Sequence, residues 1–204
     1  MKKVLRILLI ILGVIALYMA GTFIYSNHFT SKASNVMLSK KDKANLSKQK
    51  ALIIYFSLSG NTQIAADQIK QYTNADIVRL EPQTPYPKDY DDYVPVARKQ
   101  LKTKAYPAIK DNLPNLNQYS VIYVGFPTWW HQPPRIIHTL FRDYDFKNKV
   151  IVPFTTSMSD PISKSMPYIK KMAQKDHAKV INGFRYDDNN QELKDYLKKN
   201  KLIK

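Results

Sequence analysis

Apolar residues follow two alternating patterns along most of this chain. In five short segments they are nearly continuous, and these segments are residues 51–56, 76–80, 120–126, 149–154 and 179–184. In four other segments they recur every three or four positions, and these are residues 63–72, 135–141, 166–173 and 192–199. Continuous apolar strands that alternate with helices are typical of a parallel sheet covered on both faces. The pattern therefore predicts an α/β fold.

The expected topology follows from the connections between these segments. Right-handed crossovers leave few arrangements for such a chain, and five strands favour a doubly wound parallel sheet in the order 2-1-3-4-5, within three α/β/α layers. The connection between the second and third strands, residues 81–118, is long and rich in tyrosine and proline. We predict a helix within it at residues 93–101, with Pro95 in the first turn, where proline is tolerated. A connection of this length is often functional, although it can also serve only to cover the sheet.

A different pattern precedes the first strand. Residues 7–25 form a run of 19 residues without charge, which is long enough to cross a membrane as a helix. Lys2, Lys3 and Arg6 come before this run and favour a cytoplasmic N-terminus, although four lysines on its other flank compete with them. A cleaved signal peptide is the alternative, but the apolar stretch of such a peptide is usually ~7–15 residues. We therefore favour an uncleaved transmembrane helix.

Three parts of the chain are expected from these patterns. Residues 1–25 are predicted to be a single-pass anchor in the cell membrane, residues 26–50 a flexible basic tether, and residues 51–204 a folded domain on the extracytoplasmic side. The formal net charge of +16 is shared equally between two parts of the chain. The first 50 residues carry nine basic residues and one acidic residue, and residues 51–204 carry 23 basic and 15 acidic residues. A solvated lysine surface is the simplest account of the charge on the folded domain, and attraction to an anionic lipid or polymer is the alternative.

The composition also excludes several kinds of chemistry. Cysteine is absent, which rules out disulfides, thiolate metal sites and a cysteine nucleophile. The histidines of the folded domain, His131, His138 and His177, have no carboxylate at metal-ligand spacing, so we expect no metal site. Basic and aromatic residues form no recognised nucleic-acid motif, so no nucleic-acid partner is expected. No side chain is assigned a catalytic role.

The turn after the first strand reads "SLSGNT", residues 57–62. In a doubly wound sheet, ligands bind beyond the carboxyl ends of the strands, and the helix that follows begins with unpaired amide hydrogens that favour an anion. The hydroxyls, the asparagine amide and the glycine suit a phosphate monoester. The turn lacks the G-K-[ST] of a Walker loop and the two glycines of a G-x-S-x-G elbow. A capped helix start without a ligand is the remaining alternative.

Two other strand ends are expected beside this turn. Residues 127–130, "PTWW", contain both tryptophans of the chain. An aromatic pair there can stack on a flat ring, or it can fill the rim of the sheet as packing. Residues 155–157, "TTS", offer hydroxyl groups and main chain. Together the three turns predict a pocket with a phosphate end, a stacking face and a polar rim.

The motifs "YFSLSGNT" (55–62) and "GFPTWW" (125–130) resemble those of the flavodoxin family, and the resemblance covers roughly residues 50–200. It implies an FMN site on a flavodoxin-like fold. By this resemblance the phosphate would be held by Ser57, Leu58, Ser59, Gly60, Asn61 and Thr62, the isoalloxazine ring would be walled by Pro127, Thr128, Trp129 and Trp130, and its pyrimidine end or N5 would be faced by Thr155, Thr156 and Ser157.

Two features depart from the family pattern. The third loop has no glycine, whereas the same loop is glycine-rich in similar family members, and the domain is basic, whereas electron-carrier flavodoxins tend to be acidic. The resemblance implies a membrane-anchored FMN protein that acts as an electron carrier or oxidoreductase. Its partners would be a redox protein or a small-molecule donor or acceptor such as a quinone. The alternative is a binding or scaffold protein of the same fold whose flavin site is degraded.

Overall fold

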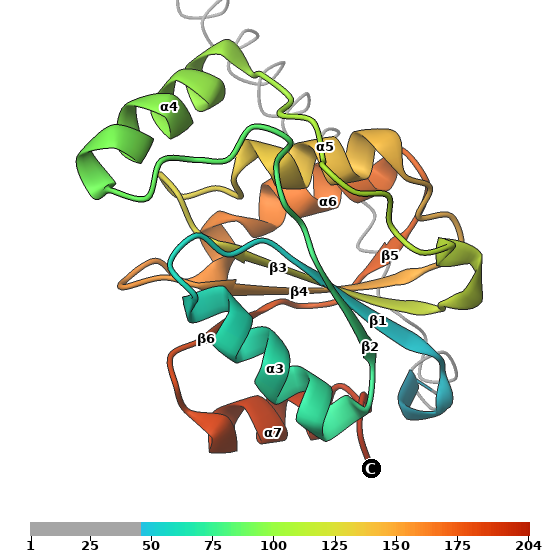
Figure 1. Cartoon of the computed structure of the whole chain (residues 1–204). Helices are drawn as coiled ribbons and strands as arrows, with labels where there is room; N and C mark the ends of the chain where they lie inside the picture. The colour runs from blue at the N-terminus through green and yellow to red at the C-terminus, as the bar shows by residue number, and fades with distance from the viewer. Residues whose placement is uncertain (1–45) are drawn as a thin grey trace, which may run out of the picture. The chain divides into compact units, whose positions relative to one another are not determined.

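Parallel strands form the central layer of residues 46–204, the part of the chain that the computed structural model describes. The sheet has the order β2-β1-β3-β4-β5, and β6 also pairs with β4 (Figure 1). The strands are β1 (Ala51–Tyr55), β2 (Asp76–Arg79), β3 (Val121–Pro127), β4 (Val150–Thr156), β5 (Lys179–Val180) and β6 (Phe184–Tyr186). The predicted order 2-1-3-4-5 is confirmed.

The fifth predicted strand, residues 179–184, is divided in the structure. Its two pieces, β5 and β6, both run parallel to β4 and are separated by residues 181–183. Gly183 lies in this break, where a Cβ atom would come within 2.3 Å of Cδ1 of Ile162 and 3.0 Å of the carbonyl oxygen of Pro153. The chain can therefore pass this close to β4 only with a residue that has no side chain.

Helices cover both faces of the sheet (Figure 1). On one face lie α3 (Asn61–Thr73) and α7 (Asn190–Lys199), and on the other lie α4 (Tyr90–Thr103), α5 (Arg135–Asp143) and α6 (Met166–Gln174). Alternate residues of β1 supply the two cores. Ile53 and Tyr55 pack with α3 and α7, whereas Leu52 and Ile54 pack with α4, α5 and α6. Burial of both faces explains why β1 and β3 are almost wholly apolar, whereas β2 at the edge of the sheet keeps Asp76 and Arg79.

The four helices predicted from periodicity are present within a few residues of their expected bounds. The helix in the long connection also exists, but it begins at Tyr90 and not at residue 93. Pro95 therefore lies inside α4, and the prediction that it occupies the first turn is wrong. Asp91 and Asp92 lie in that first turn, where carboxylates interact favourably with the helix dipole, and this accounts for the earlier start.

The predicted membrane anchor, residues 1–25, lies outside the described residues, and so does most of the predicted tether. Within residues 46–204 no helix combines the length and the apolar character that a membrane crossing requires. The described part begins with a 3-10 turn, Leu46–Lys48, which leads into β1. The side chain of Leu46 is buried against the core that α3 and α7 share.

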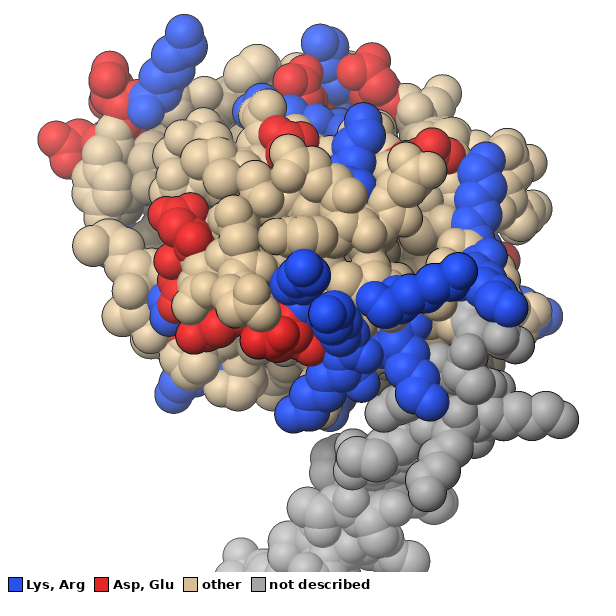
Figure 2. All heavy atoms as spheres, turned by 90° about the horizontal axis from the view of Figure 1, so that it is seen from below, with Lys and Arg blue, Asp and Glu red and all other residues tan. Residues whose placement is uncertain are grey.

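Charged side chains form two adjacent patches on the face seen in Figure 2. Lys and Arg side chains gather in one patch and Asp and Glu side chains in the patch beside it, while charges of both signs are mixed over the rest of the face. Along α7, Glu192 lies in the first turn and Lys198 and Lys199 lie in the last turn. This arrangement complements the helix dipole. Since α7 begins just after β6 ends, its acidic end is the one nearer the carboxyl edge of the sheet.

Candidate functional site

The carboxyl ends of β1, β3 and β4 lie side by side. The register pairs Tyr55 with Gly125 and Gly125 with Phe154, so the three strands end at one edge of the sheet. The first loop (residues 56–60), the second loop (residues 128–134) and the third loop (residues 157–161) follow these strands. The structure therefore brings together the three turns that the sequence predicts to form a pocket.

The first loop ends in a sharp turn at the start of α3. Ser57 is buried, and its hydroxyl oxygen accepts a hydrogen bond from the amide of Gly60 at 3.1 Å. Gly60 has a φ of 94° and stands at the N-cap of α3, where no side chain caps the helix. A Cβ atom at Gly60 would meet nothing within 4 Å. The loop thus presents a left-handed glycine and an uncapped helix start to open space, which suits an anion.

A pair of buried hydroxyls connects this helix start to β4. Oγ1 of Thr62 lies 2.8 Å from Oγ1 of Thr156, and either can be the donor. Each hydroxyl has one hydrogen and two acceptor positions. After one hydroxyl has donated to the other, one hydrogen of the pair is still free to donate to a ligand. The pair therefore both fixes the two elements and keeps a donor beside the first loop.

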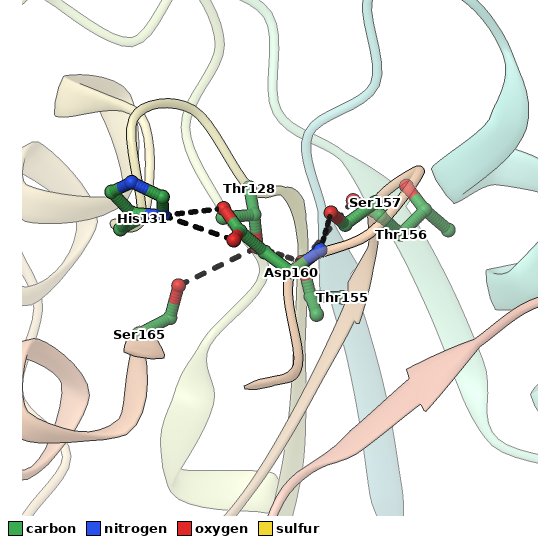
Figure 3. A network of polar contacts seen from close by, with 7 residues as sticks. All are labelled: Thr128, His131, Thr155, Thr156, Ser157, Asp160 and Ser165. Carbon is green, nitrogen blue, oxygen red and sulfur yellow. Dashed lines mark hydrogen bonds and ion pairs between the residues drawn. The ribbon is translucent and has the colours of Figure 1, made fainter. Parts of the chain in front are cut away.

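Thr128, the first residue of the second loop, is held to the end of β4, which leads into the third loop. The amide of Thr128 donates to the carbonyl oxygen of Thr156 at 3.0 Å. The Thr155 hydroxyl donates to the carbonyl oxygen of Phe126 at 2.7 Å. Because that uses its only hydrogen, the 2.8 Å contact between the hydroxyls of Thr128 and Thr155 must have Thr128 as donor. Ser165, 3.5 Å from Thr128, completes this polar network (Figure 3).

The two tryptophans have different environments. Trp129 packs against the core, with its ring stacked on Tyr93 at 5.7 Å and edge-on to Phe56 and Tyr86 at 5.6 and 5.4 Å. Trp130 is 38% exposed and has a φ of 46°, which is unusual for a residue with a side chain. Packing therefore accounts for Trp129, whereas Trp130 is partly exposed, with the guanidinium of Arg98 5.5 Å from its ring centroid.

The long connection contributes to this aromatic cluster. Tyr86 is buried, and its hydroxyl donates to Oε1 of Gln100 at 2.6 Å. Burial raises the pKa of Tyr86 to about 12, and the hydrogen bond to Gln100 opposes this shift only in part. The phenol is therefore neutral at physiological pH. The long connection therefore covers one face of the sheet, as expected, and it also packs directly against the second loop.

The third loop forms a turn of its own. The hydroxyl oxygen of Ser157 accepts a hydrogen bond from the amide of Asp160 at 2.8 Å, and the carboxylate of Asp160 contacts Nδ1 of His131 at 2.8 Å (Figure 3). Met158 is fully exposed. In this glycine-free loop Met158 projects into solvent, whereas the Asp160 carboxylate reaches the second loop and is engaged there by His131.

Two arginines outside the predicted set contact the loops. A guanidinium nitrogen of Arg79 donates to the carbonyl oxygen of Ser57 at 2.8 Å, and one of Arg185 donates to the carbonyl oxygen of Ser157 at 3.1 Å. Both lie near the carboxyl ends of strands that neighbour β1 and β4. The sequence contained a signal for both residues, because Arg79 lies in the predicted second strand and Arg185 follows the fifth, but the loop motifs alone do not reveal it.

The comparisons with known proteins agree with this geometry. The family model described as Flavodoxin matches residues 50–200. The chain belongs to the flavodoxin family. A comparison with curated proteins found no match.

Solved structures from this fold group are similar over most of the described domain. A candidate flavoprotein of Bacteroides eggerthii is 29% identical with a TM-score of 0.67, and the match covers 74% of this chain and 96% of that chain. A second candidate flavoprotein, of Bacteroides uniformis, is 28% identical with a TM-score of 0.67 and coverages of 73% and 97%. A flavoprotein of Lactobacillus acidophilus solved in complex with FMN is 23% identical with a TM-score of 0.60 and coverages of 72% and 98%.

In this flavodoxin-family domain the predicted site residues lie at one edge but differ in accessibility. Ser57, Thr62, Thr155 and Thr156 are buried, whereas Ser59, Asn61 and Trp130 are exposed, and Leu58, Gly60, Pro127, Thr128, Trp129 and Ser157 are intermediate. No group of three His, Asp or Glu side chains within residues 46–204 is arranged to hold a metal ion. The site therefore consists of hydroxyls, main-chain amides and aromatic rings.

Proposed function

We propose that residues 46–204 bind FMN at the carboxyl edge of β1, β3 and β4, and that the chain works as an electron carrier or oxidoreductase. The observation that carries the proposal is the turn at Gly60, whose positive φ and uncapped helix start leave main-chain amides facing open space. Membership of the flavodoxin family supports it. When bound, FMN supplies the redox chemistry, and the protein sets access and potential.

The residues of the first loop suit the phosphate end of the ligand. The buried hydroxyl pair of Thr62 and Thr156 keeps one hydrogen to donate, and the first amides of α3 are uncapped. A phosphate monoester accepts hydrogen bonds from such donors without needing a cation in the loop itself. The side chains of Ser59 and Asn61 are exposed and can add further donors.

The second and third loops suit the ring end. Trp130 and Met158 are exposed apolar side chains at the rim, and such side chains suit the face of a flat heterocycle. The Thr128–Thr155 hydrogen bond holds the second loop to the end of β4, and the His131–Asp160 contact joins it to the third loop. A ring held between them is shielded from water on the protein side, while its outer edge stays accessible to a donor or acceptor.

The expected partners and location are part of the proposal. The apolar run at residues 7–25 and the basic residues before it support a membrane-tethered protein with the domain outside the cytoplasm. In that setting, a membrane quinone or an exported redox protein is a suitable acceptor or donor. Protease treatment of intact cells checks the orientation, because the proposal requires the domain to be digested without cell lysis.

A direct binding measurement tests the flavin assignment. The full chain, purified in mild detergent, should retain a yellow chromophore or take up added FMN with quenching of tryptophan fluorescence. Replacement of Gly60 with Ala should weaken FMN binding, because a residue with a side chain is strained by about 1 kcal/mol or more at a φ of 94°. A colourless wild-type chain that does not respond to FMN overturns the proposal.

A second function is supported by one observation. One face of Trp129 is covered by Tyr93, so part of the predicted stacking face is occupied by the protein itself. This favours the alternative in which the fold serves as a binding or scaffold module with an altered flavin site. The titration above separates the two functions, because only the first requires FMN uptake by the wild-type chain.

A further inference from the structure

We infer that Arg79 and Arg185 are positioning residues that aim one main-chain amide each, from the first and the third loop, into the flavin site. The inference rests on the proposed FMN function. Arg79 is assigned to the phosphate end and determines the preference for FMN over riboflavin, whereas Arg185 is assigned to the ring end. The two arginines come from β2 and β6, the strands that neighbour β1 and β4.

The two loops are constructed in the same way, although they are far apart in the sequence. In each, a serine hydroxyl accepts a hydrogen bond from the amide three residues later, at 3.1 Å for Ser57 and 2.8 Å for Ser157. In each, an arginine from the neighbouring strand donates to the carbonyl oxygen of that same serine. The repetition of both contacts indicates a shared role.

Peptide geometry connects these contacts to the site. A trans peptide is planar, and its carbonyl and amide groups point in opposite directions. Because the guanidinium of Arg79 holds the carbonyl oxygen of Ser57, the amide hydrogen of Leu58 on the same peptide must point away from that guanidinium. No acceptor within residues 46–204 engages this amide hydrogen. It is therefore a donor held ready for a ligand.

The same argument applies to the third loop. Arg185 holds the carbonyl of Ser157 at 3.1 Å, and its other nitrogen pairs with Asp187 at 2.8 Å. The amide hydrogen of Met158, on the same peptide as that carbonyl, also has no acceptor among the described residues. A loop without glycine thus gains a fixed donor through an arginine and not through backbone freedom.

The position of Arg79 also gives the first loop a positive charge that its own sequence lacks. Its guanidinium also donates to Oε1 of Gln63, in the first turn of α3, at 3.3 Å. Glu81 lies 3.9 Å from its Nε atom and is shared with Lys110 at 3.5 Å. The cation therefore lies behind the loop, where it polarises the Ser57 peptide, and the ligand meets amide hydrogens. Such an arrangement favours a phosphate dianion over the uncharged end of riboflavin.

The test compares FMN and riboflavin binding in matched variants of the full chain. Arg79→Gln and Arg185→Gln each remove one guanidinium, and Lys198→Gln is the control because it removes one positive charge from the last turn of α7. Loss of a partly exposed charge-assisted hydrogen bond should weaken binding about tenfold. Dissociation constants come from flavin fluorescence titration, and thermal unfolding verifies that each variant is folded.

We expect R79Q to weaken FMN binding about tenfold, while the affinity for riboflavin changes by less than about twofold. We expect R185Q to weaken the binding of both flavins by similar factors. If R79Q loses equal affinity for FMN and riboflavin, or loses none, the assignment of Arg79 is overturned. If R185Q binds both flavins as the wild-type chain does, the assignment of Arg185 is overturned. If K198Q loses as much FMN affinity as R79Q does, net charge explains the effect and the inference is also overturned. Failure of the wild-type chain to bind FMN is a separate result, visible before any variant is compared, and it removes the proposed function together with the inference.

Discussion

His131 and Asp160 join the second and third loops of the site directly. Nδ1 of His131 lies 2.8 and 2.9 Å from the two carboxylate oxygens of Asp160. The His131 side chain is 70% exposed and that of Asp160 is 22% exposed, so the contact lies at the rim of the domain. His131 also has a φ of 65°, and Trp130 before it has 46°. The contact therefore fixes the end of a segment whose backbone is in the left-handed region.

Replacement of Asp160 with Ala should loosen this rim. Exposed contacts of this kind contribute about 0.2–1 kcal/mol, so FMN affinity should fall about 1.4- to fivefold, with little change in the unfolding temperature. The backbone amide of Asp160, which donates to Ser157, is kept in this variant. Ser159→Ala, an exposed neighbour, is the control. Equal effects of the two substitutions on FMN titration would contradict the role given to the pair.

The Thr62–Thr156 hydroxyl pair should contribute to fold stability as well as to binding. Thr156→Val has a similar shape but leaves the buried hydroxyl of Thr62 without its partner, which costs about 1–3 kcal/mol. The double variant T62V/T156V removes both polar groups and should recover part of this loss. Urea unfolding of the two single variants and the double variant gives the coupling energy. Additive losses would show that the two hydroxyls do not interact.

The two tryptophans should respond differently to truncation. Trp129→Ala removes a ring in contact with Phe56, Tyr86 and Tyr93, and it should lower the free energy of unfolding by about 3 kcal/mol. Trp130→Ala should change the free energy of unfolding by less than about 0.5 kcal/mol. It should weaken FMN binding, because this ring is exposed at the rim. Chemical unfolding and FMN titration of both variants separate the effects. A destabilised W130A that binds FMN normally would reverse this assignment.

Much of the fold could be predicted from the sequence because the central strands β1, β3 and β4 are buried on both faces. Continuous apolar segments marked the strands, and right-handed crossovers then left the order that the structure has. The convergence of the three loops followed from the same rule, since parallel strands end at one edge. The break between β5 and β6 could not be predicted, because the constraint on Gly183 comes from Ile162 and Pro153, which are distant in sequence.

The finer structure of the site depends on contacts between distant segments. Stacking of Trp129 on Tyr93 requires the position of α4, which lies within the long connection and has no fixed relation to the second loop in the sequence. The bond from Arg79 to the main chain of Ser57 also crosses between strands. Patterns in a loop show which donors it carries. They do not show which side chain of a neighbouring strand will orient it.

The half-buried His138 should make the fold sensitive to acid. Arg135 donates to its Nδ1 at 3.0 Å, and its Nε2 is buried without a partner among the described residues. Burial, together with the positive charge of Arg135, lowers the pKa of His138 from 6.5 to about 4. Between these two values the unfolded chain binds a proton that the folded chain does not. Stability is therefore complete above pH 6.5 and falls as the pH approaches 4.

His138→Gln should remove this dependence, because an amide does not ionise and its oxygen can still accept from Arg135. After a discount for partial exposure, the free energy of unfolding of the wild-type chain should fall by about 2 kcal/mol more than that of H138Q between pH 7 and pH 4. Urea unfolding of both proteins at several pH values measures the difference, and comparison with the variant removes the contribution of the carboxylates that titrate in the same range. Parallel stability curves would show that the folded protein accommodates a charged imidazole at this position.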